Sequence, residues 1–571
     1  MKKNIYLLIV FAMLSLTTAK AQQANIYAYE LKASVVADNG DVQFTYTLNA
    51  DALSVTIDVS NGESFELTET DDLTKGFHTV TKTLANPPEK DEEYTWSVTA
   101  VGADPPETPT MITSLIEKFT FVTPRSIAID NNADSPYFGN VYVLNAYTGA
   151  SDNGTTDQRN QTQKGIYIFN PLLERQNPVG ETLPPTIFAY GSGVSWGTSF
   201  DAPHSVSVAP DGKVYIANGL ASPAGSIWCL DPENLSSNLV PVFSEGQGIT
   251  PYCWVTGTGE NTKIYTTKIS AAITSTAVAD YPLRMEFSVY DIGATIPSNA
   301  APVKIFANNT LINNGVNRFV PGQDGGWWIT QGSRTAAGST WSGSNPRTSA
   351  SLIYIAANGT VVYNSVNDPG VHPYFDTMGT GSVGSIAVSP DGKFIAVASF
   401  RAYQLIQVFS IEYDTDGNPA LTFEYSFNNG SGGATGVGTV LADYVGLAFD
   451  WANNLYTGDA AGEWLRVWAT PKTSNIATTP APAAQVLKID PASGVKNIAG
   501  IGNVRVVCLG NQITVTSGSA IKSVKLYDLQ GRILVSKNVS AKNCTLSAPA
   551  KGIYIIETIT ANGRDIQKIL T

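Results

Sequence analysis

Apolar and polar residues alternate through most of this 571-residue chain with the two-residue period of β-strands. No long stretch shows the apolar 3.6-residue period of an amphipathic helix. The 50 Gly, 25 Tyr and 21 Phe, against only five Met, suit many short strands joined by turns. The pattern therefore predicts an all-β fold, and the length predicts several domains.

A two-strand unit recurs six times within residues 111–492. Each copy has an apolar strand, a turn built on Asp-Gly or Asn, and a second strand that ends in an aromatic residue. The copies begin at or near Ser126, Ser205, Trp254, Asn317, Ser385 and Gly446. One such hairpin cannot bury its apolar face alone, so a repeat of roughly sixty residues predicts blades around an axis. We expect a six-bladed β-propeller, with seven blades as the alternative.

The sixth blade needs an outer strand, and two segments can supply it. Residues 118–122 precede the first blade, and residues 486–489 follow the last. Use of the N-terminal segment would close the ring with a shared blade and remove an exposed sheet edge. The sequence leaves both choices open.

Two further modules flank the repeats. Residues 22–110 alternate strictly, for example at Phe44, Tyr46 and Leu48, which predicts a small immunoglobulin-like β-sandwich before a Pro-rich link at 103–109. Residues 471–482, rich in Thr, Pro and Ala, are interpreted as a linker. Residues 504–571 alternate again and predict a compact C-terminal β-sandwich.

The first 21 residues have the pattern of an export signal. Lys2 and Lys3 precede an apolar run at 5–16, and small residues stand at Ala19 and Ala21. The apolar run is too short to span a bilayer and no later stretch is long enough, so we expect no transmembrane segment. The pattern predicts a protein exported through the periplasm and either secreted or held at the outer cell surface.

Charge and cysteine content narrow the partners and the chemistry. A formal net charge of −13 argues against nucleic acid, whose phosphates are bound by clustered Lys and Arg. Four cysteines are too few for a disulfide framework in so long a chain. Cys508 with Cys544 and Cys229 with Cys253 can be paired, but buried free thiols explain them equally well.

The long connections of the predicted propeller all fall on one face, namely those between strands two and three and those from strand four to the next blade. Binding residues commonly lie on such loops. We therefore expect a ligand site there, although individual rings can instead fill the interfaces between blades. The candidates are the aromatic residues of this face and polar residues at the starts of inner strands: Arg125, Tyr147, Trp196, His204, Tyr252, Trp254, Asn317, Trp341, Tyr374, Phe375, Tyr403 and Trp464.

Catalytic candidates are few. His204 begins an inner strand, and His372 stands four residues before Asp376, which would suit a base with an orienting acid. A histidine bonded to backbone is the more common case, so we assign no catalytic residue. No nucleophile elbow, zinc-protease motif or phosphate loop is present, and we expect no cofactor.

Three segments resemble known families. Residues 44–51, with Lys75–His78 and Glu93–Trp96, resemble the immunoglobulin-like module of the flagellar hook-capping family, which implies an architectural part. Residues 202–218 resemble the repeats of NHL and gluconolactonase-like six-bladed propellers. Lactonases of that kind hold a divalent ion with Glu, Asn and Asp. The equivalent positions here are Arg125, His204, Asn317, Gly384 and Val445, a poor set for such an ion, so we expect no metal.

The C-terminal module has a more specific resemblance. Tyr527-Asp528-x-x-Gly531-Arg532, then Gly552-Ile553-Tyr554 and a basic-apolar end at 568–571, resemble the sorting domain of the type IX secretion system of Bacteroidetes. The resemblance implies the type IX secretion machinery as a partner and transport across the outer membrane.

These features together favour a secreted or surface-displayed binding protein that recognises an extracellular glycan, glycoprotein or other protein. The alternative is a lactonase-like hydrolase or a lyase that acts in the propeller channel through His204 or His372. A ring of acidic side chains around the channel would favour the enzyme, and a shallow aromatic-lined face would favour the binding protein. The sequence does not name the ligand.

Overall fold

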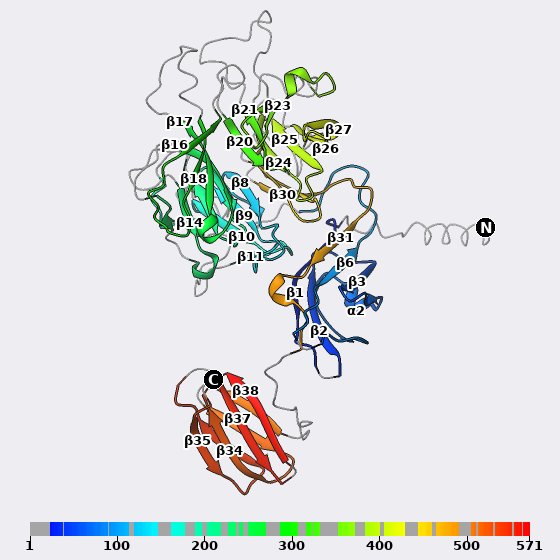
Figure 1. Cartoon of the computed structure of the whole chain (residues 1–571), viewed down its shortest axis with the longest axis vertical. Coiled ribbons are helices and arrows are strands. Elements are labelled where there is room, and N and C mark those ends of the chain that lie inside the picture. The colour runs from blue at the N-terminus through cyan, green and yellow to red at the C-terminus, as the bar shows by residue number, and fades with distance from the viewer. Residues whose placement is uncertain are drawn as a thin grey trace, which may run out of the picture. The chain divides into compact units, whose positions relative to one another are not determined.

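The protein is represented by a computed structural model (Figure 1). It describes residues 23–37, 39–89, 91–113, 119–146, 162–176, 189–196, 203–218, 227–235, 239–243, 249–269, 286–306, 316–322, 324–331, 352–371, 383–399, 405–428, 444–459, 464–489, 504–509, 512–528, 531–550, 553–561 and 563–570.

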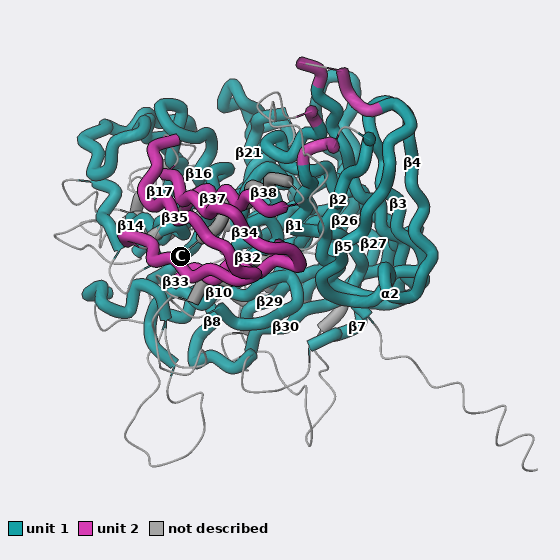
Figure 2. Tube along the Cα trace, turned by 90° about the horizontal axis from the view of Figure 1, so that it is seen from below, with its two compact units in different colours: residues 1–34, 39–86, 93–487 teal, residues 35–38, 87–92, 488–571 magenta. Residues whose placement is uncertain are grey.

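The chain divides into two compact units (Figure 2). The first comprises residues 1–34, 39–86 and 93–487, and it contains a sandwich and a propeller. The second comprises residues 35–38, 87–92 and 488–571, and it contains the C-terminal sandwich. The fold is all-β, as the alternating pattern predicts.

Six antiparallel four-stranded sheets form the propeller, one for each predicted repeat. Blade one has β8 (Pro124–Ile129), β9 (Val141–Asn145), β10 (Gly165–Phe169) and β11 (Arg175–Gln176), and blade two has β12 (Ser205–Val208), β13 (Val214–Ala217), β14 (Ile227–Leu230) and β15 (Val240–Pro241). Blade three has β16 (Ile249–Thr256), β17 (Lys263–Ile269), β18 (Glu286–Asp291) and β19 (Val303–Phe306), and blade four has β20 (Val316–Pro321), β21 (Trp327–Gln331), β22 (Leu352–Ile355) and β23 (Val361–Asn364). Blade five has β24 (Val383–Val388), β25 (Phe394–Ser399), β26 (Leu405–Tyr413) and β27 (Pro419–Asn428), and blade six has β28 (Tyr444–Phe449), β29 (Leu455–Asp459), β30 (Trp464–Ala469) and β7 (Thr110–Met111).

The inner strands of successive blades adjoin, and β28 of blade six lies beside β8 of blade one, so the ring closes. The turns between first and second strands follow the predicted chemistry. Gly212, Gly325 and Gly392 have φ values of 81°, 81° and 69°, in the left-handed region that favours glycine. In blade six Asn453 takes this conformation, with φ 62°.

The N-terminal side of the chain closes blade six. β7 pairs with β30, placing Met111 opposite Trp468 and Thr110 opposite Ala469. Of the predicted segment 118–122, Thr120 forms a single bridge to Trp464. The outer strand of blade six is therefore supplied by chain that precedes blade one, as the first alternative predicts. The paired residues, however, lie nearer the N-terminus than residues 118–122. The second alternative is wrong, because Leu487 pairs with Tyr94 in the sandwich.

The N-terminal sandwich has two sheets, and one strand comes from beyond the propeller. Its sheets have the orders β1 (Ala28–Ala33), β2 (Asp41–Leu48), β5 (Gly76–Thr83) and β31 (Ile476–Pro480), β6 (Trp96–Val101), β3 (Ser54–Val59), β4 (Ser64–Leu67), with the short helix α2 (Thr70–Leu73) before β5. Phe44 of β2 packs against Trp96 of β6 with ring centroids 4.9 Å apart, which joins the two sheets. The linker interpretation of residues 471–482 is wrong, since Ile476 to Pro480 pair with Val101 to Ser97.

The sandwich is fixed to the propeller by buried amide side chains. Asn25 donates its backbone N–H to Asn454 Oδ1 at 2.7 Å, and Asn454 Nδ2 donates to the Asn25 carbonyl at 2.9 Å. Asn475 Oδ1 accepts from Ile26 N at 2.8 Å, and the Tyr27 ring packs edge-on against Phe138 of blade one. The sandwich is therefore a fixed part of the first unit, held against the short turns of blades one and six.

The C-terminal unit has sheets of the orders β32 (Val504–Leu509), β33 (Gln512–Ser517), β36 (Asn543–Ser547) and β35 (Ile533–Asn538), β34 (Ile521–Tyr527), β37 (Ile553–Thr560), β38 (Gly563–Leu570). Ile513, Val515, Val524, Leu526 and Ile556 are fully buried in its core. Asp528, Gly531 and Arg532 lie between β34 and β35, and Gly531 N donates to the Asp528 carbonyl at 3.0 Å. Asp528 accepts from Arg532 N at 2.8 Å and from Arg532 Nε at 2.6 Å, and Gly531 has φ 78°. The Asp, Gly and Arg of the segment that resembles a sorting motif therefore stabilise a turn.

The described part of the chain contains no helix long and apolar enough to cross a membrane. Cys229 and Cys253 are buried free thiols, which answers the pairing question for these two residues. Cys544 is also a buried free thiol, and the side chain of Cys508 lies outside the described residues.

The junction between sandwich and propeller contains a buried acid whose titration is testable. Burial raises the pKa of Asp450 to about 7, even though Asn454 and the backbone of Ala452 donate hydrogen bonds to its carboxylate. The unfolded chain has the ordinary Asp pKa of about 3.9. Between these values the folded state binds more protons than the unfolded state. The contribution of Asp450 to the free energy of unfolding should therefore fall as the pH rises from about 4 to about 7.

Thermal unfolding of the wild type and Asp450→Asn across this pH range measures the effect. The stability of the variant should lack the decrease with rising pH that Asp450 causes. Asp414 is the matched control, because it caps an exposed turn and hydrogen bonds from Asn418 lower its pKa. Asp414→Asn should leave this slope almost unchanged, because the stability that the lowered pKa of Asp414 provides is lost only below about pH 4. Identical slopes in the wild type and Asp450→Asn would contradict the assignment.

Candidate functional site

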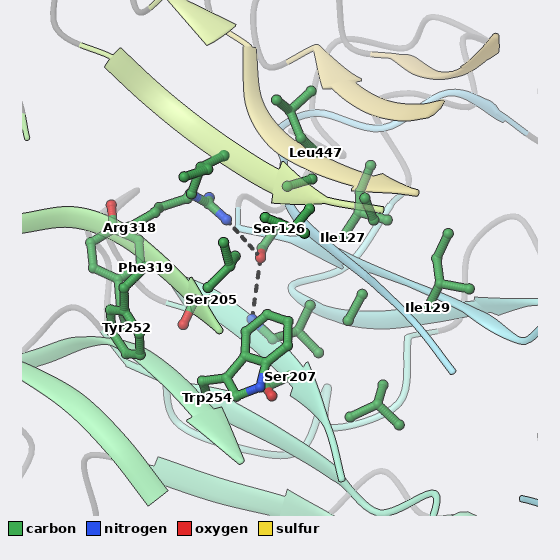
Figure 3. A pocket seen from close by; sticks show the side chains of 18 of the residues that line it. Ser126, Ile127, Ile129, Ser205, Ser207, Tyr252, Trp254, Arg318, Phe319 and Leu447 are labelled. Atoms are coloured by element: carbon green, nitrogen blue, oxygen red, sulfur yellow. Dashed lines mark hydrogen bonds between the residues drawn. The ribbon is translucent and has the colours of Figure 1, made fainter. Parts of the chain in front are cut away.

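The inner strands of all six blades surround a cavity of about 120 Å³ on the propeller axis (Figure 3). The inner strand of each blade contributes three or four residues: Ser126–Ile129, Ser205–Val208, Tyr252–Trp254, Arg318–Val320, Ile386–Val388 and Leu447–Phe449. Asn131 also lines this cavity. Most of these side chains are apolar, so the few polar groups decide what the cavity can bind.

Serine hydroxyls join the inner strands of blades one to three. An inner strand is the edge of its own sheet, so part of its N–H row has no partner there. Ser126 Oγ accepts from Val206 N at 3.3 Å, Ser205 Oγ from Cys253 N at 3.2 Å, and Ser207 Oγ from Val255 N at 3.1 Å. Each short side chain thus provides the acceptor that the next blade lacks.

Arg318 connects blade four to blade one, which lies opposite it in a ring of six. Its Nη1 donates to Ser126 Oγ at 3.1 Å and its Nη2 donates to the Arg125 carbonyl at 2.7 Å. The side chain is buried, and its Cζ lies 5.4 Å from the centre of the Tyr252 ring. Burial lowers the pKa of Arg318 to about 10, so the guanidinium remains charged at neutral pH.

Arg125 and His204 meet where the inner strands of blades one and two begin. Arg125 Nη2 lies 3.0 Å from His204 Nε2. Arginine has only donors, so Nε2 must be the acceptor and the neutral ring must carry its proton on Nδ1. The Tyr252 ring packs edge-on against the imidazole at 4.7 Å. The basic lone pair of His204 is therefore already used, which argues against a role as a general base.

A second cavity of about 590 Å³ lies at the face of the short turns, opposite the long-loop face on which the sequence predicts the ligand site. It adjoins the first, since six residues line both: Ile129, Asn131, Val208, Trp254, Val320 and Val388. Asp130 lines it, and burial raises the pKa of Asp130 to about 6 against the hydrogen bonds from Ser135 and Asn132 N. Trp254 is half-buried and stands where the two spaces meet.

The structure brings three of the predicted site residues into contact: Arg125, His204 and Tyr252. Trp254 lines the axial cavity with Tyr252. Trp196 is a correction, because it is only 3% exposed, packs in the core between blades one and two, and donates Nε1 to the Gly191 carbonyl. Trp464 packs partly buried against the core shared by blades six and one. Asn317 lies in β20, but its side chain is outside the described residues. So are Tyr147, Trp341, His372, Tyr374, Phe375, Asp376 and Tyr403.

Sequence reasoning missed Arg318 and the serines. A signal was present, because Ser126, Ser205 and Ser385 hold equivalent positions in three repeats, and Arg318 places a charge inside an otherwise apolar inner strand. Among the described residues, no three His, Cys, Asp or Glu side chains gather in a way that could hold a metal ion.

Comparisons with known proteins cover parts of the chain. Residues 496–570 match a family described as Domain of unknown function (DUF8694). A 77-residue stretch is 31% identical to Autophagy-related protein 21 of Vanderwaltozyma polyspora, and it spans 14% of this chain and 18% of that protein. The chain thus covers less than a fifth of this relative.

Solved structures with a similar fold include PorZ of Porphyromonas gingivalis, described as an essential bacterial surface component of the type-IX secretion system. It is 12% identical with a TM-score of 0.32, over 93% of this chain and 68% of that chain. A Trichoderma reesei protein of Carbohydrate-Active Enzymes Family AA12 is 12% identical with a TM-score of 0.36, over 64% and 98% of the two chains. At these values neither assigns a ligand, partner or reaction to this chain.

The tautomer of His204 is a direct prediction of the site. Because Arg125 can only donate, the imidazole should be neutral with its proton on Nδ1 and with Nε2 unprotonated. Long-range ¹⁵N NMR correlations of the imidazoles report this, and the chain has only three histidines, so His204→Gln assigns the signal. A protonated Nε2 at neutral pH would mean that the pair is not as described and would restore His204 as an acid-base candidate.

Proposed function

We propose that this chain is a secreted or cell-surface binding protein whose propeller recognises a glycan or glycoprotein. The position of Trp254 is the observation that carries the proposal. Its half-buried indole stands between the axial cavity and the wider one, where a sugar ring can pack on it. Aromatic rings offer a large apolar area with little loss of entropy, which suits carbohydrate faces and polar rims.

The hydrogen bonds of the channel support binding over catalysis. Ser126, Ser205 and Ser207 accept from backbone N–H groups of neighbouring blades. His204 accepts from Arg125. A hydrolase or lyase reaction in the channel would need a base. The candidate base there is His204, and its contact with Arg125 already occupies the ring nitrogen that would accept a proton. His372 and Asp376 lie outside the described residues, so a hydrolase or lyase that uses them stays the alternative function.

Two sequence features support export of the protein and its display at the cell surface. Residues 1–21 have the pattern of an export signal, and residues 504–571 resemble a type IX sorting domain. The C-terminal unit has a core of its own, as an independently folded signal domain would require. The type IX secretion machinery is accordingly the proposed partner during export.

Binding is tested with an oligosaccharide array and titration calorimetry on the full-length protein. Trp254→Ala should weaken binding of the best oligosaccharide about tenfold or more, because it removes the central aromatic surface. The matched control is Trp196→Phe, a change in a buried ring of the propeller core, which should lower the melting temperature and leave the affinity unchanged. Unchanged affinity in folded Trp254→Ala would reject the site. Turnover of a lactone or glycan by the wild type would favour the alternative function, an enzyme.

Export is tested by deletion of residues 504–571. The first unit has its own cores, so the shortened protein should fold but accumulate in the periplasm instead of reaching the cell surface. Lys263→Ala in the full chain is a control, since it removes one exposed ion pair of the propeller, that with Asp291, worth about 0–1 kcal/mol, and should leave surface display intact. Normal display of the shortened chain would contradict the sorting assignment.

A further inference from the structure

Arg318 is a buried charge without a buried counter-charge. It is 9% exposed, and the partners that the structure gives it are Ser126 Oγ, the Arg125 carbonyl and the face of Tyr252. No Asp or Glu of the described residues forms an ion pair with it, although the chain has 48 acidic residues. Its Nε is buried and has no hydrogen-bond partner. Burial of a charge in such surroundings costs stability.

A comparison with Arg175 shows how the surroundings of two buried arginines of the propeller differ. Arg175 is also buried in the propeller, and its guanidinium lies 4.6 Å from the Phe121 ring centre and 4.9 Å from that of Tyr167. It also donates to the Thr120 carbonyl at 3.0 Å. Arg175 therefore has packing partners on several sides, and it lines neither axial cavity, whereas Arg318 forms part of a cavity wall.

A second positive charge adds to the first. Arg125 lies close enough that its charge helps to lower the pKa of Arg318, after the larger effect of burial. Of the two guanidinium groups only that of Arg318 lines the cavity, but both charges add to a positive potential that an entering anion would neutralise.

The serine hydroxyls in the same wall are donors as well. In the bonds that the structure shows, Ser126 Oγ accepts from Val206 N and Arg318, and Ser207 Oγ accepts from Val255 N. A hydroxyl has one hydrogen besides its acceptor lone pairs, so both can still donate. Together with Arg318 Nε, the wall offers N–H and O–H groups of the kind that bind oxyanions.

One acceptor stands further along the cavity. Asn131 Nδ2 donates to the Phe449 carbonyl at 2.8 Å, while Asn131 Oδ1 is buried without a hydrogen-bond partner. Asn131 lines both the axial cavity and the wider one. The acidic group of a ligand could accept from the N–H and O–H groups of the wall, while a hydroxyl of the same ligand donates to Asn131 Oδ1. Acidic sugars have both groups.

The size of the space agrees with this chemistry. A single water needs roughly 10–15 Å³ of such space, so the axial cavity of about 120 Å³ has room for a carboxylate or sulfate group. The adjoining cavity of about 590 Å³ can take the rest of the sugar beside Trp254.

We propose that the propeller channel binds the acidic group of an anionic glycan, a uronate carboxylate or a sulfate ester, through Arg318, Ser126 and Ser207, with Asn131 Oδ1 accepting a sugar hydroxyl. This inference rests on the proposed glycan-binding function and specifies its ligand class. Arg125 contributes charge, and Trp254 packs on the sugar.

The test uses full-length protein and three oligosaccharide probes of equal length: an oligogalacturonate, a sulfated oligogalactan and a neutral oligogalactan. Calorimetric affinity should be at least tenfold higher for one of the two acidic probes than for the neutral one, and the better acidic probe identifies the anion. Arg318→Met should remove this preference, and Ser207→Ala should reduce it. Arg175→Met, the matched change at a buried arginine outside the channel, should keep it.

The opposing outcome is a purely structural Arg318. In that case Arg318→Met would lower the melting temperature, as Arg175→Met does, and leave the preference for acidic probes unchanged, which overturns the inference. If Arg318→Met does not fold, Arg318→Lys and Ser207→Ala decide, since both should weaken the acidic probe selectively. Equal wild-type affinity for acidic and neutral probes rejects this inference and leaves the proposed function intact. Failure of the wild type to bind any oligosaccharide rejects both.

Discussion

The structure depends on how the inner edges of the blades are satisfied. Every blade ends at the axis in an edge strand, whose outer backbone groups have no partner within its own sheet. Serine side chains solve this for blades one to three, because each hydroxyl accepts from the next inner strand. Arg318 extends the same network across the axis to Ser126. The polar groups of the candidate site are therefore also structural links, which explains why they lie on rigid strands.

The outer edges follow the same physical rule on a larger scale. Blade six obtains its fourth strand from β7, and the sandwich obtains β31 from the chain that leaves the propeller. Both connections between the modules are thus held in sheets. The buried amides of Asn25, Asn454 and Asn475 then fix the junction from inside. A propeller held in this way presents its axial cavities with little freedom to rearrange, so a ligand would meet a preformed site.

The sequence predicted those parts of the fold that have a strong local signal. Six Asp-Gly or Asn turns between apolar strands sufficed for the blade count, because backbone conformation selects these residues. β7 and β31 were missed for opposite reasons. β7 has two residues and no measurable period, while β31 has the composition of a linker and becomes a strand only because Val98 and Ala100 of β6 lie opposite it.

The candidate site was predicted only in part, because the sequence pattern favoured the long-loop face, whereas the wider of the two cavities lies at the short turns. Arg125, His204, Tyr252 and Trp254 were found because repeat equivalence or loop position marks them. Trp196 was misassigned because an aromatic residue in a loop can fold back into the core, and its Nε1 bond to Gly191 shows that it does. Arg318 was overlooked because its meaning comes from blade one, 192 residues away in sequence.

The most direct measurement for the central claim is a crystal structure of the full-length protein with an acidic oligosaccharide bound. We predict that the carboxylate or sulfate lies within hydrogen-bond distance of Arg318 in the axial cavity, with a sugar ring packed on Trp254. A saccharide bound only at the long-loop face, with the axial cavity holding water, would contradict the account.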